Sequence, residues 1–201
     1  MAAGTGLRER KRAQTRRDIH QAAVRMFLER GFDDVTVAEI ADEASVALTT
    51  LFTYYPAGKV GLLFEQEEDR AAALLQAVSD RPAGTDPLSA IESFMDNRLP
   101  FDRDDRDSRQ LLDLIFSTPQ LRAYVRKKWT DCEDALAAAL AEEWREEQSA
   151  DLRALARFIL ESPDIAAREP SPTDSLRTIF ANLRRGWARE GARSPAAAAE
   201  D

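Results

Sequence analysis

Cysteine and histidine are almost missing from this chain of 201 residues, which has one of each, Cys132 and His20. A single cysteine excludes disulfides within the chain and is typical of a reducing compartment, so we expect a cytoplasmic protein. No group of cysteines and histidines has the spacing of a zinc site, and we predict no metal. Cys132 is best explained as a small core residue on a helix stripe, because redox sensing needs an exposed thiol.

Long apolar runs, glycine-rich loops and catalytic motifs are missing as well. No run approaches the ~18 apolar residues that cross a membrane, so we predict no membrane partner, and the N-terminus has no apolar signal-peptide segment. The eight glycines form no phosphate-binding loop. No motif places a catalytic partner beside His20, which a surface or phosphate-facing role explains better. We therefore predict that the protein is not an enzyme and carries no cofactor.

Positive charge is scarce overall but concentrated at the N-terminus. The formal net charge is −8, yet residues 1–30 carry eight basic and three acidic groups, a net of +5. Residues 31–59 have a net charge of −4 and the remainder −9. A basic segment of this kind can bind phosphates or enter the minor groove. The alternative is a solvated basic tail.

The most informative stretch runs from Thr36 to Lys59 and predicts two short helices joined by a tight turn. Thr36 and Glu39 have the spacing of a capping box, which starts the first helix. The buried stripe of this helix has a period near 3.6 residues and comprises Val37, Ile40, Ala41 and Ala44. Residues 45–47 then separate the helices, which is a typical helix-turn-helix turn length.

The second of these helices has an unusual outward face. Its buried stripe is predicted at Leu48, Leu51, Phe52 and Tyr55, and Pro56 ends it. The outward residues are then Thr49, Thr50, Thr53 and Tyr54, in place of the Glu and Lys of an ordinary solvated face. Hydroxyls bond phosphate oxygens and base edges, and threonine offers a methyl group to thymine. The pattern indicates a DNA-recognition helix, with a threonine-rich helical hairpin as the alternative.

The rest of the chain predicts further helices, because its apolar residues keep the helical period and show no strand-like alternation. A first helix should run from about Arg8 or Lys11 to Arg30, where Gly31 ends it. Later helices are expected near 59–79, 86–99, 108–117, 119–147, 150–161 and 172–187, with a short helical turn at Ser162 and Pro163. The predicted fold class is all-α, with a three-helix helix-turn-helix head joined to a C-terminal helical bundle and about nine helices in all.

The helix-turn-helix stretch resembles the TetR-type transcriptional regulators over about residues 10–65. The resemblance rests on T-L-F-x-Y-Y-P-x-x-K before an apolar helix, with matches at Ala44, Val46, Thr50, Leu51, Phe52, Tyr54, Tyr55, Lys59 and Leu62. Two departures concern the turn. Ser45 replaces the turn glycine, which takes a positive φ most easily. Ala47 replaces a serine that would cap the recognition helix, a loss of ~1 kcal/mol.

The resemblance implies a ligand-responsive regulator, most simply a repressor, that binds a palindromic DNA operator as a homodimer. Phosphate contacts would come from Arg16, Arg17, Thr36 and Lys59. A basic N-terminal arm would comprise Arg8, Arg10, Lys11 and Arg12. Bases would be approached by Thr49, Thr50, Thr53 and Tyr54. Phe52 stands at the family's backbone-contact position, and Leu48 stands where a polar DNA contact is common.

The resemblance also implies two domains: residues 1–58 bind DNA, and residues 59–190 bind a small-molecule effector and dimerise. Residues 191–201, which end in AAAAED, are expected to form a disordered tail. Ligand pockets are mostly apolar with a few polar groups. The residues that could form such a wall are Phe94, Met95, Arg98, Leu112, Ile115, Phe116, Tyr124, Trp129 and Phe158. A place in the ordinary core is the alternative for each of them.

Dimerisation is implied through the last two long helices, and the final helix has a stripe too apolar to face water. The predicted interface comprises Leu152, Leu155, Ile159, Leu176, Ile179, Phe180, Leu183 and Trp187. The rival interpretation of the whole chain is an all-α protein-interaction module without sequence-specific DNA binding. Strong, salt-dependent binding to DNA would separate the two.

Overall fold

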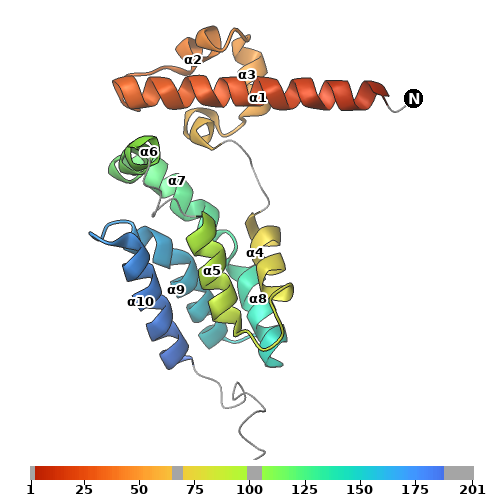
Figure 1. Ribbon diagram of the computed structural model, residues 1–201, viewed down its shortest axis with the longest axis vertical. Coiled ribbons are helices and arrows are strands. Elements are labelled where there is room, and N and C mark those ends of the chain that lie inside the picture. The colour runs from red at the N-terminus through yellow and green to blue at the C-terminus, as the bar shows by residue number, and fades with distance from the viewer. Residues whose placement is uncertain (1–2, 65–69, 99–105, 188–201) are drawn as a thin grey trace, which may run out of the picture. The chain divides into compact units, whose positions relative to one another are not determined.

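The protein is described by a computed structural model at residues 3–64, 70–98 and 106–187 (Figure 1). These residues form ten α-helices and one 3₁₀ helix and contain no strand, which confirms the all-α prediction. The chain divides into two compact units. The first contains the N-terminal helices and α6, and the second contains α4, α5, α8, α9, α10 and most of α7. The functional domain boundaries predicted at residues 58 and 190 stay a prediction.

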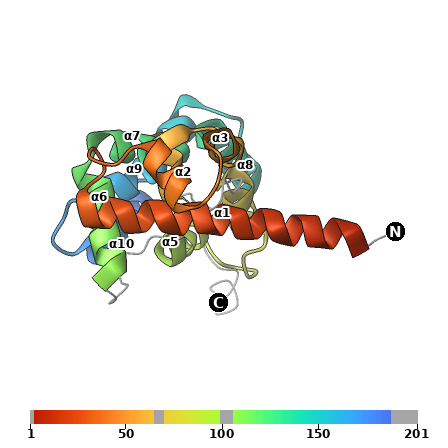
Figure 2. The same ribbon diagram turned by 90° about the horizontal axis from the view of Figure 1, so that it is seen from above.

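The first unit is organised around the long helix α1, Ala3–Arg30. Against it lie α2, Val37–Glu43, and η1, Gly58–Leu63, while α3, Leu48–Tyr54, packs on α2 (Figure 2). Helix α6, Arg106–Ser117, also contacts α1. Isolated helices of seven residues are not stable, so α2 and α3 depend on burying side chains here. The larger buried side chains of these segments include Ile19, Phe27, Phe32, Val35, Ile40, Leu51, Tyr55 and Leu62, and Ala23 is buried among them.

Helix α1 begins earlier than predicted and ends as predicted. It starts at Ala3, so the arm expected at residues 8–12 is helical. Gly31 has a φ of 88°, the left-handed conformation that closes a helix. Phe32 then folds back on Phe27 with ring centroids 5.1 Å apart.

The predicted continuous helix over 59–79 is wrong at its start. Residues 58–63 form the 3₁₀ helix η1, whose last bond runs from the Phe64 N–H to the Gly61 carbonyl. Phe64 is extended, with φ −117° and ψ 111°. Helix α4 is Arg70–Ser79, and residues 65–69 lie outside the described residues. Gly58 and Gly61 are weak helix formers, which explains why periodicity alone overextended the helix.

The predicted helix over 119–147 is two helices, α7, Pro119–Thr130, and α8, Glu133–Trp144. Lys127 and Lys128 lie in the last turn of α7, and Glu133 and Asp134 in the first turn of α8. Cations stabilise a helix C-terminus and anions an N-terminus, so the charge order fits a break at this point. Arg145 closes α8 with a φ of 53°.

Helix α9, Ala150–Ala166, continues through Pro163, where the prediction placed an end at residue 161. Proline has no N–H, so the carbonyl of Ile159 loses its helical donor. The buried Ser162 hydroxyl donates to that carbonyl at 2.6 Å. The replacement bond explains how the helix accommodates the proline.

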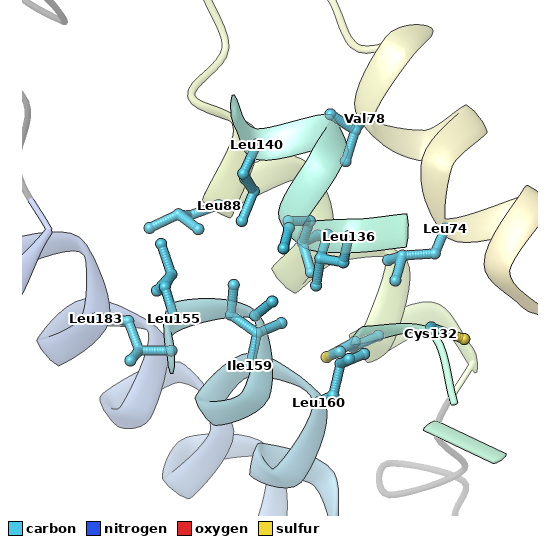
Figure 3. Close-up of a cluster of buried hydrophobic side chains, with 14 of the residues drawn as sticks. Leu74, Val78, Leu88, Cys132, Leu136, Leu140, Leu155, Ile159, Leu160 and Leu183 are labelled. Carbon is cyan, nitrogen blue, oxygen red and sulfur yellow. The ribbon is translucent and has the colours of Figure 1, made fainter. Parts of the chain in front are cut away.

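The core of the second unit lies between α4, α5, Pro87–Arg98, α8, α9 and α10, Pro172–Gly186. Figure 3 shows leucines of several helices, among them Leu88, Leu136, Leu155 and Leu183, gathered in one cluster with Ile159. Charged pairs fasten α7 to α9: Arg122 donates twice to Asp164, at 2.6 and 2.7 Å. These bonds hold the pKa of the Asp164 carboxyl below its usual value.

Candidate nucleic-acid interface

The start of α2 is held by the predicted capping box. The Glu39 N–H donates to the Thr36 hydroxyl at 3.2 Å, and the Thr36 N–H donates to the Glu39 carboxylate at 2.7 Å. The Thr36 hydroxyl donates to the same carboxylate at 2.7 Å. The two bonds from Thr36 to the carboxylate, together with one from Arg30, lower the pKa of Glu39 to about 2. The hydroxyl proposed for a phosphate is therefore already engaged, although Thr36 itself is exposed.

The turn between α2 and α3 forms without its usual residues. Ser45 takes a φ of 54°, the left-handed conformation that favours glycine. The Val46 N–H donates to the Ala41 carbonyl at 2.9 Å and closes the turn. Ala47 begins α3 with no side-chain cap. The two departures noted in the sequence therefore both have a structural consequence: Ser45 is left-handed, and α3 has no side-chain cap.

The predicted buried stripe of α3 is only half right. Leu51 and Tyr55 are buried, and the Tyr55 hydroxyl donates to the Arg16 carbonyl at 3.0 Å. Leu48 and Phe52 are 42% and 45% exposed, which corrects their predicted burial. Residues i and i+4 form one row along a helix. Because α3 packs on one side only, the row of Leu51 and Tyr55 is buried and the neighbouring row of Leu48 and Phe52 is exposed.

The outward face of α3 agrees with the prediction at two of its four residues. Thr49 and Thr53 are exposed, and Thr50 and Tyr54 are partly buried. The Thr53 hydroxyl donates to the Thr49 carbonyl at 2.9 Å. Its proton is therefore unavailable to a phosphate or a base acceptor in this conformation.

Basic side chains of α1 lie beside α3. The Arg12 guanidinium is 5.8 Å from the centroid of the Tyr54 ring, and that of Arg16 is 4.9 Å from the Tyr55 ring. The other predicted basic residues of α1 are exposed: Arg8, Arg10, Lys11 and Arg17. Two guanidinium groups of α1, those of Arg12 and Arg16, thus lie at the border of α3, where phosphate contacts beside a recognition helix would be made.

The ammonium group of Lys59 already makes contacts within the first unit. Its ammonium lies 4.5 Å from the centroid of the Phe32 ring and 3.4 Å from the Asp33 carbonyl oxygen. These contacts tie η1 to the segment after α1. A phosphate contact by Lys59 would have to compete with them.

The predicted effector pocket is divided between the two units. Phe94, Met95 and Trp129 belong to the second, where the rings of Phe94 and Trp129 are 6.5 Å apart in an edge-on arrangement. Leu112, Ile115 and Phe116 lie on α6 in the first. Phe158 is 53% exposed, so it lines no closed pocket, and Tyr124 is partly buried. The Arg98 side chain lies outside the described residues.

Two features of the second unit were missed from the sequence. The Arg70 guanidinium lies 4.5 Å from the centroid of the Trp129 ring, and the buried Trp129 indole N–H has no hydrogen-bond partner among the residues described. A groove of about 450 Å³ also runs between α4 and α8, lined by Leu75, Gln76, Val78, Ser79, Ala135, Ala138, Ala139, Glu142 and Glu143. The run of small alanines on α8 was the available signal for that groove.

Most of the predicted dimer interface is core within one chain. Six of the eight side chains, Leu152, Leu155, Ile159, Leu176, Phe180 and Leu183, are buried, and Ile179 and Trp187 are partly buried. Buried side chains cannot themselves touch a second chain. The large apolar side chains of α9 that are exposed are instead Phe158 and Ile165.

Over residues 3–64, 70–98 and 106–187, no group of three or more His, Cys, Asp or Glu side chains could hold a metal ion. In the same ranges no helix combines the length and apolarity needed to cross a membrane.

Residues 19–65 match the family model described as "Bacterial regulatory proteins, tetR family". The transcriptional regulator TcmR of Streptomyces glaucescens is 35% identical over 88 residues, 44% of this chain and 38% of TcmR. A Mycobacterium tuberculosis protein, MftR, described as a candidate transcriptional regulator of mycofactocin biosynthesis, is 30% identical over 139 residues. That match covers 66% of this chain and 67% of MftR. The chain therefore spans well under half of TcmR and two thirds of MftR.

Solved structures agree on the fold. SmeT, the repressor of the Stenotrophomonas maltophilia multidrug efflux pump SmeDEF, superposes with a TM-score of 0.58 at 17% identity, covering 90% of this chain and 93% of SmeT. Its complex with triclosan gives a TM-score of 0.56 at 20% identity, over 94% and 98% of the two chains.

Proposed function

Because the chain belongs to the tetR family of bacterial regulatory proteins, we propose that it is a cytoplasmic, ligand-responsive repressor that binds a palindromic operator as a homodimer. The observation that carries this proposal is the outward face of α3. It combines exposed hydroxyl and apolar groups with guanidinium groups of α1 at its border. A helix of this composition enters a major groove, and the arginines hold the flanking phosphates.

A dimer follows from the operator geometry that we propose. Two recognition helices reach successive major grooves when they stand roughly 34–36 Å apart, or a multiple of that. The surface that we propose for dimerisation is the exposed side of α9 with Phe158 and Ile165. Phe158 is joined there by Trp187, with ring centroids 5.8 Å apart.

The dimer surface can be tested by charge insertion. Phe158→Glu should give monomers in sedimentation and weaken operator binding, while the fold is kept because the side chain is exposed. Arg153→Glu is the matched control, since this exposed residue lies on a different side of α9. If Phe158→Glu remains dimeric, the interface lies elsewhere.

For the effector we propose a small aromatic molecule with a hydrogen-bond acceptor. The support is the pair of rings at Phe94 and Trp129, the guanidinium of Arg70, and the indole N–H of Trp129, which has no hydrogen-bond partner within the described part of the chain. A buried donor without a partner costs about 1–3 kcal/mol, which a ligand acceptor would relieve. SmeT, a structural neighbour, forms a complex with the small molecule triclosan. Such a compound should lower operator affinity in the wild type and less so in Trp129→Phe.

The experiment that tests DNA binding is selection of bound fragments from a random DNA pool, followed by affinity measurements at several salt concentrations. Arg12→Gln and Arg17→Gln should each reduce the slope of log K against log salt by about 0.9 if each loses one phosphate contact. Lys127→Gln removes the same charge from an exposed residue of α7 and should leave the slope unchanged. If the pool yields no enriched sequence and binding does not depend on salt, the protein-interaction module is favoured.

A further inference from the structure

The seven residues of α3 contain no side chain that reads a base by paired hydrogen bonds. Arg and Lys read guanine in this way, Asn and Gln read adenine, and Asp and Glu accept from cytosine. The helix has the sequence LTTLFTY and includes none of these six residue types. Any base discrimination by α3 must therefore come from other groups.

Apolar surface is the most prominent of those groups. Leu48 and Phe52 are two of the four large apolar side chains that are exposed in the described part of the chain. A Cβ atom added at Gly58 would lie 3.9 Å from Cε1 of Phe52, so part of that ring faces the start of η1. Leu48, at the first turn of α3, is thus the apolar side chain best placed for a base, because recognition helices contact bases through their N-terminal residues.

Thr53 offers a methyl group and no free hydroxyl proton. The Thr53 hydroxyl proton is committed to the Thr49 carbonyl, at 2.9 Å. The hydroxyl can still accept a hydrogen bond, but it cannot donate to the acceptors on guanine or thymine. Its γ-methyl group remains, and threonine methyl groups and apolar side chains both pack on the 5-methyl group of thymine.

We propose that α3 reads its operator through thymine 5-methyl groups, which Leu48 and the methyl group of Thr53 contact in the major groove. The inference rests on the proposed operator binding and narrows it to half-sites with at least one such thymine. It also fits the charge distribution, because the arginines of α1 provide affinity without sequence information while α3 adds only uncharged contacts.

The direct test replaces thymine by uracil, one position at a time, in an operator selected from a random pool. The substitution keeps base pairing and every hydrogen-bonding group in the groove and removes only the methyl group. Burial of one methyl group is worth ~0.8 kcal/mol, so each contacted position should lose affinity about fourfold. Positions that are not contacted should bind as before, which provides an internal control.

Protein variants assign the contact to side chains. Leu48→Ala should remove the difference between thymine and uracil at the position that Leu48 contacts. At Thr53, Ser keeps the hydroxyl and loses the methyl group, while Val keeps the methyl group and loses the hydroxyl. We expect Thr53→Ser to lose the thymine preference and Thr53→Val to retain it. Melting curves check that all three variants fold, as the exposure of these side chains predicts.

Two failures are distinguishable. If the pool yields an enriched operator but no thymine shows a uracil penalty, or the penalty is unchanged in every variant, the thymine inference is wrong and operator binding stands. If no operator is enriched, the proposed function itself fails.

Discussion

Helices α2 and α3 have seven residues each and follow one another in the chain, yet they are fixed by different means. Helix α2 has a complete capping box, and ion pairs join Glu39 to Arg30 and Glu43 to Arg25 on α1. Helix α3 has no side-chain cap, and Leu51 is its one buried side chain. Helix α2 uses polar side chains for its cap and for ion pairs to α1. Helix α3, which we propose as the recognition helix, makes neither kind of contact, and its exposed side chains remain available for DNA.

The largest effect should come from the one buried side chain of α3. Leu51→Ala should lower the free energy of unfolding by about 2–5 kcal/mol, because Leu51 is fully buried. Leu48→Ala is the same substitution three residues earlier at an exposed position and should change it by less than about 0.5 kcal/mol. Urea unfolding of both variants measures the difference. Equal losses would show that Leu48 also belongs to the core.

The next effect concerns the cap of α2. Thr36→Ala should lower the free energy of unfolding by ~1 kcal/mol, because the N–H of Glu39 loses its acceptor. Thr36→Ser keeps the hydroxyl and should recover most of that stability. Denaturant unfolding of the three proteins is the measurement, and an unaffected alanine variant would mean that the capping box adds nothing.

The missing cap of α3 gives the opposite prediction. Ala47→Ser should raise stability by ~1 kcal/mol or slightly less, because it supplies a side-chain acceptor where none exists. Melting temperature measures the gain, and operator affinity measured beside it tells whether a firmer α3 still fits DNA. A serine that leaves the melting temperature unchanged would contradict the view that α3 is under-capped.

The smallest effect is a pH dependence of the same cap. The pKa of Glu39 is lowered from 4.5 to about 2 by bonds from Thr36 and Arg30, so the folded protein holds that proton less tightly than the unfolded chain. The contribution is therefore complete above pH 4.5 and is lost as the pH falls toward 2. Thermal melts of wild type and Glu39→Gln should converge over that interval. A difference that stays constant from pH 7 to pH 2 would exclude Glu39 as the source.

Local signals made the head of the molecule predictable. Thr36 and Glu39 are three residues apart and start α2, and Gly31 directly follows α1 and ends it. Neighbouring residues alone therefore determine these helix ends. The exposure of Leu48 and Phe52 could not be predicted, because the period of a helix tells which residues share a side and not what covers that side. The assignment of the predicted pocket residues to two different units has the same cause. Helical periodicity indicates that Leu112 and Trp129 are on apolar sides of their helices, but it does not tell which unit each side chain packs in.

The errors in the second unit arise where local backbone geometry and a single side-chain bond decide where a helix ends. Proline normally ends a helix, and only the position of the Ser162 hydroxyl shows why α9 continues. Cys132 precedes α8 with φ −88° and ψ 1°, a non-helical conformation that separates α7 from α8. The apolar period continues across this break, so periodicity could not predict it.

The bond from Ser162 to Ile159 has an evolutionary consequence. While Pro163 is present, Ser162→Ala leaves a buried carbonyl without a donor, which costs about 1–3 kcal/mol. Once Pro163 has changed to alanine, the new N–H can serve that carbonyl and the serine becomes dispensable. The two sites are therefore epistatic, and the order of substitution matters: a lineage that loses the serine first leaves the Ile159 carbonyl without a donor, whereas one that loses the proline first does not.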